Sequence, residues 1–174
     1  MLRSLLALLL SVTDMPAAQP VPAPPAVTCA IRVPAEVERA KPVMLTVVLR
    51  NRGTTPLAVL NWGTPFEEAW LQPFVRVERD GRLLDYGGAM VKRGDPERDE
   101  YLRLAPGHQQ SAQIDLAEVF DLSVPGRYVI TPQMTLYDVV PLPTSLPRPR
   151  AVHASLPLPC PPATLRIVSR GQSR

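Results

Sequence analysis

The chain has 174 residues, of which 22 are proline and only two are cysteine. Its formal net charge is +3, and all the excess lies at the C-terminal end, where five arginines and no acid follow Val139. These arginines stand among prolines without interleaved aromatic residues, which argues against nucleic-acid binding and leaves anionic lipid or an acidic protein as partners. The length favours one domain with tails.

The first 18 residues are predicted to be a secretory signal peptide. Arg3 precedes a short apolar run from Leu5 to Leu10, and small residues stand at the expected cleavage site near Ala18. The run is too short to cross a bilayer as a helix. A disordered N-terminus with a chance leucine run is the alternative. The signal predicts a secreted or periplasmic protein with no transmembrane segment.

Predicted export also bears on the state of the two cysteines. Cys29 and Cys160 lie near the two ends of the mature chain, and an even number of cysteines in an exported protein predicts a disulfide. Two buried free thiols are the alternative.

Between a proline-rich leader at 19–26 and a tail at 170–174, residues 27–169 predict one all-β domain with a proline-rich insertion at 141–162. Short alternating or β-branched runs end at turn residues every 8–15 positions. They lie at 27–33, 43–51, 57–62, 74–81, 82–86, 100–107, 110–116, 126–140 (with a bend at Pro132) and 163–169. Short helical turns are expected at 65–72 and 115–122. This pattern is typical of an antiparallel immunoglobulin-like β-sandwich of about eight strands.

Two turn signals refine that prediction. Asp80-Gly81 is a hairpin signal, because both residues tolerate positive φ. Tyr128 follows a Pro-Gly turn and matches the tyrosine corner of immunoglobulin-like sandwiches, although an ordinary turn followed by a strand tyrosine fits as well.

Catalytic and metal-binding residues are not evident. The two histidines, His108 and His153, have no motif around them and are both expected in solvated loops. The sequence contains no HExxH or CxxC, and the acidic stretch at 93–101 lacks the ligand order of a calcium loop. Gly87-Gly88 is not followed by the lysine and serine of a phosphate-binding loop. We therefore expect no catalytic site, no metal and no cofactor.

A larger pattern spans residues 61–128. Its shared pieces are the turn Asn61–Pro65, Phe74 and Val77 before Asp80-Gly81, the set Tyr86, Gly88, Val91, Lys92 and Arg93, Tyr101 and Leu104 before Pro106-Gly107, and the run DLAEVFDLSVPGRY ending at Tyr128. Together they resemble the N-terminal β-domain of the secreted zinc endopeptidases of the deuterolysin and peptidyl-Lys metalloendopeptidase group. In that family a peptidase domain with an HExxH helix follows, whereas here the chain becomes proline-rich after Val140.

The resemblance implies a secreted, non-enzymatic binding module: a separate inhibitor, folding helper or targeting partner of a related exported metalloprotease. A cell-envelope interaction protein and a truncated relic of a protease are the alternatives. Within the stretch YGGAMVKR, Tyr86 is expected to end a strand and residues 89–93 to begin the next. Tyr86, Met90, Lys92 and Arg93 are then candidates for contacting a partner, beside a purely structural reading in which the arginine is buried against an acid.

Overall fold

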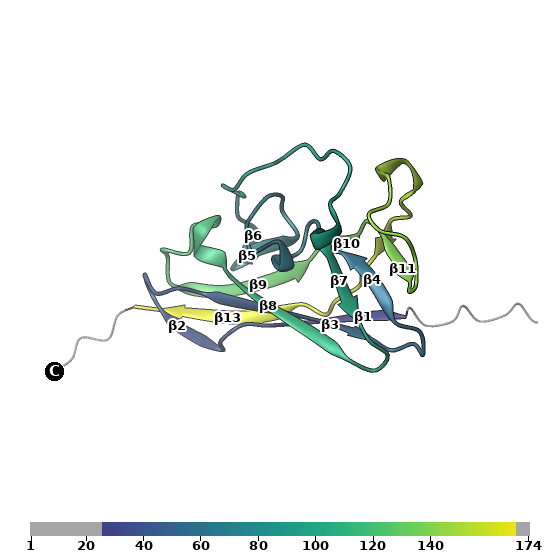
Figure 1. Cartoon of the computed structure of the whole chain (residues 1–174). Coiled ribbons are helices and arrows are strands. Elements are labelled where there is room, and N and C mark those ends of the chain that lie inside the picture. The colour runs from purple at the N-terminus through teal and green to yellow at the C-terminus, as the bar shows by residue number, and fades with distance from the viewer. Residues whose placement is uncertain (1–25, 170–174) are drawn as a thin grey trace, which may run out of the picture.

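The computed structural model describes residues 26–169. The predicted signal peptide, nearly all of the leader and the 170–174 tail lie outside these residues. Two sheets with mainly antiparallel pairing form a sandwich, and they overlap in the view of Figure 1. The first contains β1 (Val27–Arg32), β3 (Met44–Asn51) and β8 (Gln109–Asp115), in the order β1–β3–β8. The second has the order β2–β13–β9–β5–β6, formed by β2 (Glu36–Glu38), β13 (Ala163–Val168), β9 (Gly126–Pro132), β5 (Val75–Arg79) and β6 (Arg82–Leu83).

This strand order is that of an immunoglobulin-like sandwich. The two sheets correspond to the A-B-E and G-F-C-C′ layers, and the extra strand β2 pairs in parallel with β13. The two main sheets together contain eight strands, three in one and five in the other. The predicted all-β sandwich is therefore confirmed.

The core forms because apolar residues alternate along the strands of both sheets. In β3, Leu45, Val47 and Leu49 are fully buried, and in β9 Tyr128 and Ile130 are too. These side chains meet between the sheets, where period-two alternation places every second residue on the inner face. The burial of this layer supplies the main driving force for folding.

Tyr128 forms a tyrosine corner. Its ring is completely buried, and its hydroxyl donates a hydrogen bond of 2.5 Å to the carbonyl oxygen of Val124, four residues upstream. This back-bond to the turn entering β9 is the hallmark of the motif, so the first of the two sequence interpretations is correct.

A small side sheet extends the sandwich at the right-hand end of Figure 1. It consists of β4 (Leu57–Leu60), β7 (Tyr101–Leu104) and β11 (Val139–Pro141), with β4 in the middle. A further pair joins β10 (Thr135–Leu136) to β12 (Leu156–Pro157). Between the strands lie four 3-10 turns: η1 (Pro65–Glu67), η2 (Arg98–Glu100), η3 (Leu116–Glu118) and η4 (Arg150–Val152). Two of them, η1 and η3, fall where helical turns were predicted.

Cys29 in β1 and Cys160 just before β13 form a disulfide that joins the two main sheets. The predicted pairing is confirmed. The proline-rich segment 141–162 that leads to Cys160 packs against the domain, because Leu146 and Leu158 are both buried. The bend predicted at Pro132 is where β9 ends.

The hairpin at Asp80-Gly81 is also confirmed, with φ of 47° and 81° at the two residues. The strand expected at residues 89–93 is wrong: the chain from 84 to 97 contains no strand and arches over the sandwich (Figure 1). The backbone here makes isolated hydrogen bonds instead of a ladder, from the Gly87 N–H to the Val119 carbonyl oxygen and from the Val91 N–H to the Leu71 carbonyl oxygen. Gly88 leaves room for the Tyr86 side chain, because a Cβ there would lie 2.4 Å from the Tyr86 hydroxyl oxygen.

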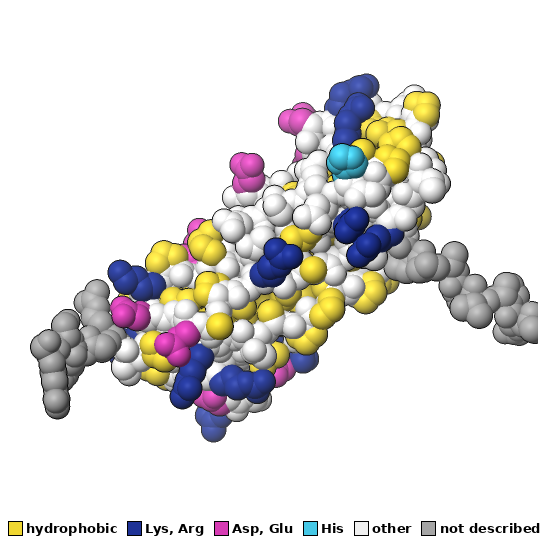
Figure 2. All heavy atoms as spheres, turned by 90° about the horizontal axis from the view of Figure 1, so that it is seen from below, with side chains coloured by type: hydrophobic (Ala, Val, Ile, Leu, Met, Phe, Trp, Pro, Cys, Tyr) yellow, Lys and Arg dark blue, Asp and Glu magenta, His cyan; other side chains and the backbone are white. Residues whose placement is uncertain are grey.

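The underside of the molecule carries both hydrophobic and basic side chains. Figure 2 shows hydrophobic side chains in a band along this face, with Lys and Arg side chains on its flanks. On the outer face of β3, Val48 is nearly buried and Met44 is partly exposed. No helix among residues 26–169 is long and apolar enough to span a membrane.

Candidate functional site

The turn Asn61–Pro65 leads from β4 into η1, on the side of the molecule that carries the 84–97 loop, here called the upper surface (Figure 1). Thr64 begins η1 as its N-cap, accepting from the Phe66 backbone N–H and donating to the Asn61 carbonyl oxygen. Gly63 has a φ of +65°, and a Cβ at this position would lie 2.1 Å from the Gln72 amide nitrogen. A larger residue would strain the backbone and displace the Gln72 side chain, so glycine is favoured at this position.

Trp62 lies on this turn with only 4% of its surface exposed. Its indole Nε1 donates to a Glu100 carboxylate oxygen at 2.7 Å. The Arg93 guanidinium carbon lies 5.1 Å from the ring centroid, a cation–π distance, and the His153 ring meets the indole edge-on at 6.2 Å. The 84–97 loop and the 141–162 segment therefore converge on one aromatic ring.

Arg93 is neutralised by a buried acid. Its Nη2 forms an ion pair with Glu67, whose side chain is 5% exposed, while that of Arg93 is 16% exposed. Burial raises the pKa of Glu67, opposed by the Gly63 N–H, which donates at 2.7 Å, and by the Arg93 charge. The structural reading of Arg93, an arginine buried against an acid, therefore describes its position.

A second buried carboxylate, that of Asp138, also pairs with an arginine. Asp138 is fully buried and accepts from Arg148 Nη1 at 2.6 Å and from the Tyr101 hydroxyl at 3.0 Å. Burial, together with the hydrogen bond to Asp138, raises the pKa of Tyr101 to about 12. The carboxylate thus attaches the 141–162 segment, through Arg148, to β7.

His153 belongs to this group. Its side chain is 6% exposed, and its Nε2 lies 3.0 Å from the Arg148 carbonyl oxygen and 3.9 Å from Asp138. The prediction of a solvated loop is therefore wrong for His153, because the 141–162 segment folds back so that its ring is covered by Asp138, Arg148 and Trp62. His108, by contrast, is exposed, as predicted.

A groove of about 620 Å³ opens above these groups. It is lined by side chains from the Trp62 turn, the 84–97 loop and the 141–162 segment: Trp62, Gln72, Val91, Lys92, Arg93, Tyr137, Arg150, His153 and Ser155. A second hollow, of about 390 Å³, shares Trp62, Lys92 and Arg93 and is otherwise lined by Gly94 and by the acids Asp95, Glu97, Asp99 and Glu100. Lys92 and Arg93 thus line both a basic groove and an acidic hollow.

The four predicted partner-binding residues do not lie together. Lys92 and Arg93 line the groove, whereas Tyr86 packs on Trp70 and Phe120 at centroid distances of 6.1 and 5.8 Å. Met90 is 79% exposed and lines neither hollow. Their role in partner binding stays a prediction.

Sequence reasoning did not identify Trp62, Tyr137, Arg150 and His153 as neighbours. Of the residues around Trp62, the sequence pattern had singled out only the turn Asn61–Pro65 and the pair Lys92 and Arg93. In residues 26–169, no group of three or more His, Cys, Asp or Glu side chains is placed to hold a metal ion.

Two curated proteins share part of this sequence. An extracellular protease of Aeromonas hydrophila is 35% identical over 88 residues, which is 51% of this chain and 25% of the relative. A neutral protease 2 homolog of Uncinocarpus reesii is 34% identical over 88 residues, 49% of this chain and 24% of the relative. The chain thus contains a protease-related region that spans about a quarter of the length of these relatives.

The other comparisons add little. No family model matches the chain. A solved structure of the Pseudomonas fluorescens alkylpurine DNA glycosylase AlkC bound to DNA aligns with 82% of this chain and 30% of its own, at a TM-score of 0.36 and 15% identity. Similarity this low supports no conclusion about fold or function.

Proposed function

We propose that the mature chain is a secreted, non-catalytic binding module that acts on a related exported metalloprotease as inhibitor, folding helper or targeting partner. The observation that carries the proposal is the region of about 35% identity to an extracellular protease. The described chain folds as a sandwich with two main sheets. It is also cross-linked by a disulfide, as suits an exported domain.

The non-catalytic role is supported by the residues present. The chain has two histidines and no HExxH. His153 is engaged by Arg148 and Asp138, and His108 stands alone in a turn. A peptidase zinc site needs three protein ligands around an open position, which these residues do not provide.

The upper surface is suited to partner binding because its side chains are held rigidly. Trp62, Arg93 and His153 are fixed by hydrogen bonds, an ion pair and ring packing. Preorganised contacts lose little side-chain entropy on association. A cell-envelope partner is the alternative, favoured by the exposed cation Arg150 in the proline-rich segment.

Affinity capture tests the proposal. The mature chain is immobilised and exposed to the secretions of the producing organism, beside a matched resin carrying the reduced, alkylated chain. We expect a metalloprotease to be enriched only on the folded chain. Its activity and refolding yield with added chain then distinguish inhibitor, helper and targeting roles. Enrichment of envelope components without a protease would contradict the proposal.

A further inference from the structure

The groove beside Trp62 carries an excess of positive charge. Lys92, Arg93 and Arg150 line it, together with His153, and no carboxylate does. Arg93 is neutralised by Glu67 beneath it. Among residues 26–169, neither Lys92 nor the Arg150 guanidinium has an acidic side chain within ion-pair distance. Two cations therefore remain available at the groove.

Arg150 is held in place without being neutralised. Its Nη1 donates to the Arg93 carbonyl oxygen at 2.7 Å, and its backbone N–H donates to Asp95 at 2.7 Å. The remaining guanidinium donors are left for a ligand, in the planar arrangement that matches a carboxylate. Because the side chain is already anchored, binding an anion costs little further ordering.

The groove also has neutral donors and aromatic walls. The Gln72 amide donates to the Tyr137 hydroxyl at 3.2 Å, and both line the groove with Trp62 and Ser155. The two free cations and the neutral hydrogen-bond donors suit an acidic side chain carried on a peptide. The neighbouring hollow carries four carboxylates beside Lys92 and Arg93, so it is less favourable for the same peptide than the groove.

We propose that this groove binds a carboxylate-bearing segment of a protein partner, with Lys92 and Arg150 as the residues that contact the acid. The inference rests on the proposed function for the partner's identity, whereas the recognition chemistry is tested separately.

The probe is the peptide acetyl-Ala-Glu-Ala-Glu-Ala-amide, compared with its glutamine counterpart, in NMR titrations of the mature chain. The chain has two tryptophans, so each indole N–H gives its own signal. Trp62 lines the groove, while Trp70 is in the main core and donates its indole N–H to the Asp115 carbonyl oxygen. We expect the glutamate peptide to shift the Trp62 signal saturably, with a Kd of about 1 mM or tighter, and to leave Trp70 unmoved.

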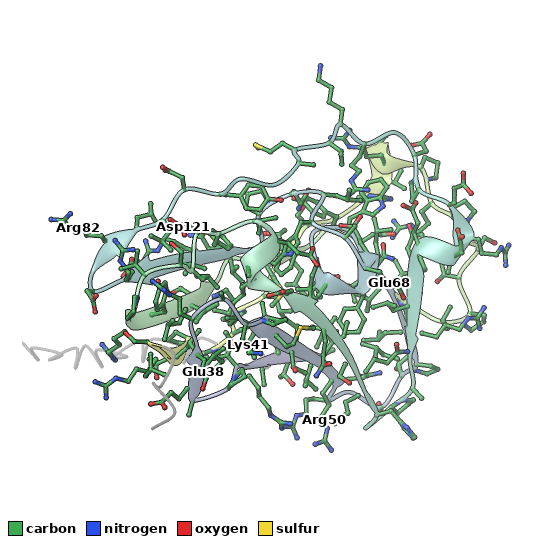
Figure 3. The ribbon with its side chains drawn as sticks, turned by 90° about the vertical axis from the view of Figure 1, so that its left-hand side faces the viewer. Glu38, Lys41, Arg50, Glu68, Arg82 and Asp121 are labelled. Atoms are coloured by element: carbon green, nitrogen blue, oxygen red, sulfur yellow. A yellow bond between two sulfur atoms is a disulfide. The ribbon has the colours of Figure 1, made fainter. Side chains whose placement is uncertain are left out.

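The exposed cations provide matched controls. Lys92→Gln with Arg150→Gln is expected to weaken binding about tenfold or more. The control, Lys41→Gln with Arg82→Gln, removes the same two positive charges elsewhere and is expected to change the affinity less than about twofold. Figure 3 shows Lys41 low on the molecule before β3 and Arg82 at the β5–β6 hairpin, both away from the loop over the top.

Three results would overturn the inference: no saturable Trp62 shift, an equal shift with the glutamine peptide, or equal weakening by both variant pairs. The spectrum of each variant shows directly whether it is folded. If the peptide binds but the wild-type chain captures no metalloprotease, the proposed function fails and the groove assignment stands. If capture succeeds equally with the Lys92 and Arg150 variant, the groove is not the protease contact.

Discussion

At the scale of single residues, the neighbouring cations Lys92 and Arg93 have opposite roles. Lys92 is exposed, whereas Arg93 lies over Trp62 and pairs with Glu67. A buried ion pair contributes modestly as a pair, but removing one partner leaves an uncompensated charge. Substitutions at the two positions should therefore separate binding from stability.

The first prediction compares two charge reversals. Arg93→Glu is expected to lower the free energy of unfolding by about 4 kcal/mol, because it places a second carboxylate beside buried Glu67. Lys92→Glu, its control, should change the stability by less than about 1 kcal/mol. Urea unfolding followed by tryptophan fluorescence measures both. Equal, small effects would show that the Arg93–Glu67 pair does not form.

The second prediction concerns Tyr101. Its pKa is raised to about 12 by burial and by Asp138, while in the unfolded chain a phenol titrates near about 10. The folded state thus retains the proton longer. The resulting stabilisation is fully present below about pH 10 and is lost as the pH rises through about 12.

Absorbance titration at the phenolate band measures this directly. Tyr101→Phe should remove a phenol that ionises near pH 12 and leave the earlier transitions in place. Loss of a phenol titrating near pH 10 instead would mean that Tyr101 does not donate to Asp138.

The third prediction concerns the tyrosine corner. Tyr128→Phe removes the bond to the Val124 carbonyl oxygen without changing the ring's packing. The expected loss is about 1 kcal/mol of unfolding free energy. Tyr137→Phe is a useful comparison, since the Tyr137 hydroxyl is bonded only to the Gln72 side chain in the described chain. An unchanged stability for Tyr128→Phe would argue against the corner.

At the scale of elements, local sequence signals predicted the main strands. Alternation identified β3 and β8, and Asp80-Gly81 identified the β5–β6 turn, because these signals are carried by adjacent residues. β2 and β12 are only three and two residues long and exist through pairing with distant strands. Short segments of this kind have no periodicity of their own to detect.

The site was less predictable for the same reason. Asp138, Tyr101, Arg148 and His153 come from β7, the approach to β11 and the proline-rich segment, and only folding brings them together. Residues 89–93 are the opposite case, in which a local signal predicted a strand that does not form. Their composition suits a strand, but within the described chain these residues pair with no neighbouring strand.

The fourth prediction tests the link between the two sheets. The disulfide closes a loop with a sequence separation of 131 residues. Loop-closure entropy then predicts a loss of about 5 kcal/mol on reduction, if the reduced chain has no residual structure. Denaturant unfolding with and without reductant measures the loss. Intact mass after alkylation of the denatured, unreduced protein should show no modified thiol, and two modified thiols would contradict the bridge.

At the scale of the whole molecule, the chain combines a disulfide-linked sandwich with a rigid, charged upper surface. The sandwich contributes stability, and the loops at 84–97 and 141–162 position Trp62, Lys92 and Arg150. Its protease-related region spans only a quarter of the relatives' length. Of Trp62, Lys92 and Arg150, the latter two are exposed and are therefore the ones that a partner could contact.

The proposed function requires that the folded chain bind a related exported metalloprotease. Sedimentation velocity of the mature chain mixed with the purified protease of the producing organism tests it most directly. The account predicts a single faster-sedimenting complex of one chain per protease, which is absent when the chain is reduced and alkylated. Two species that sediment independently at all ratios would contradict it.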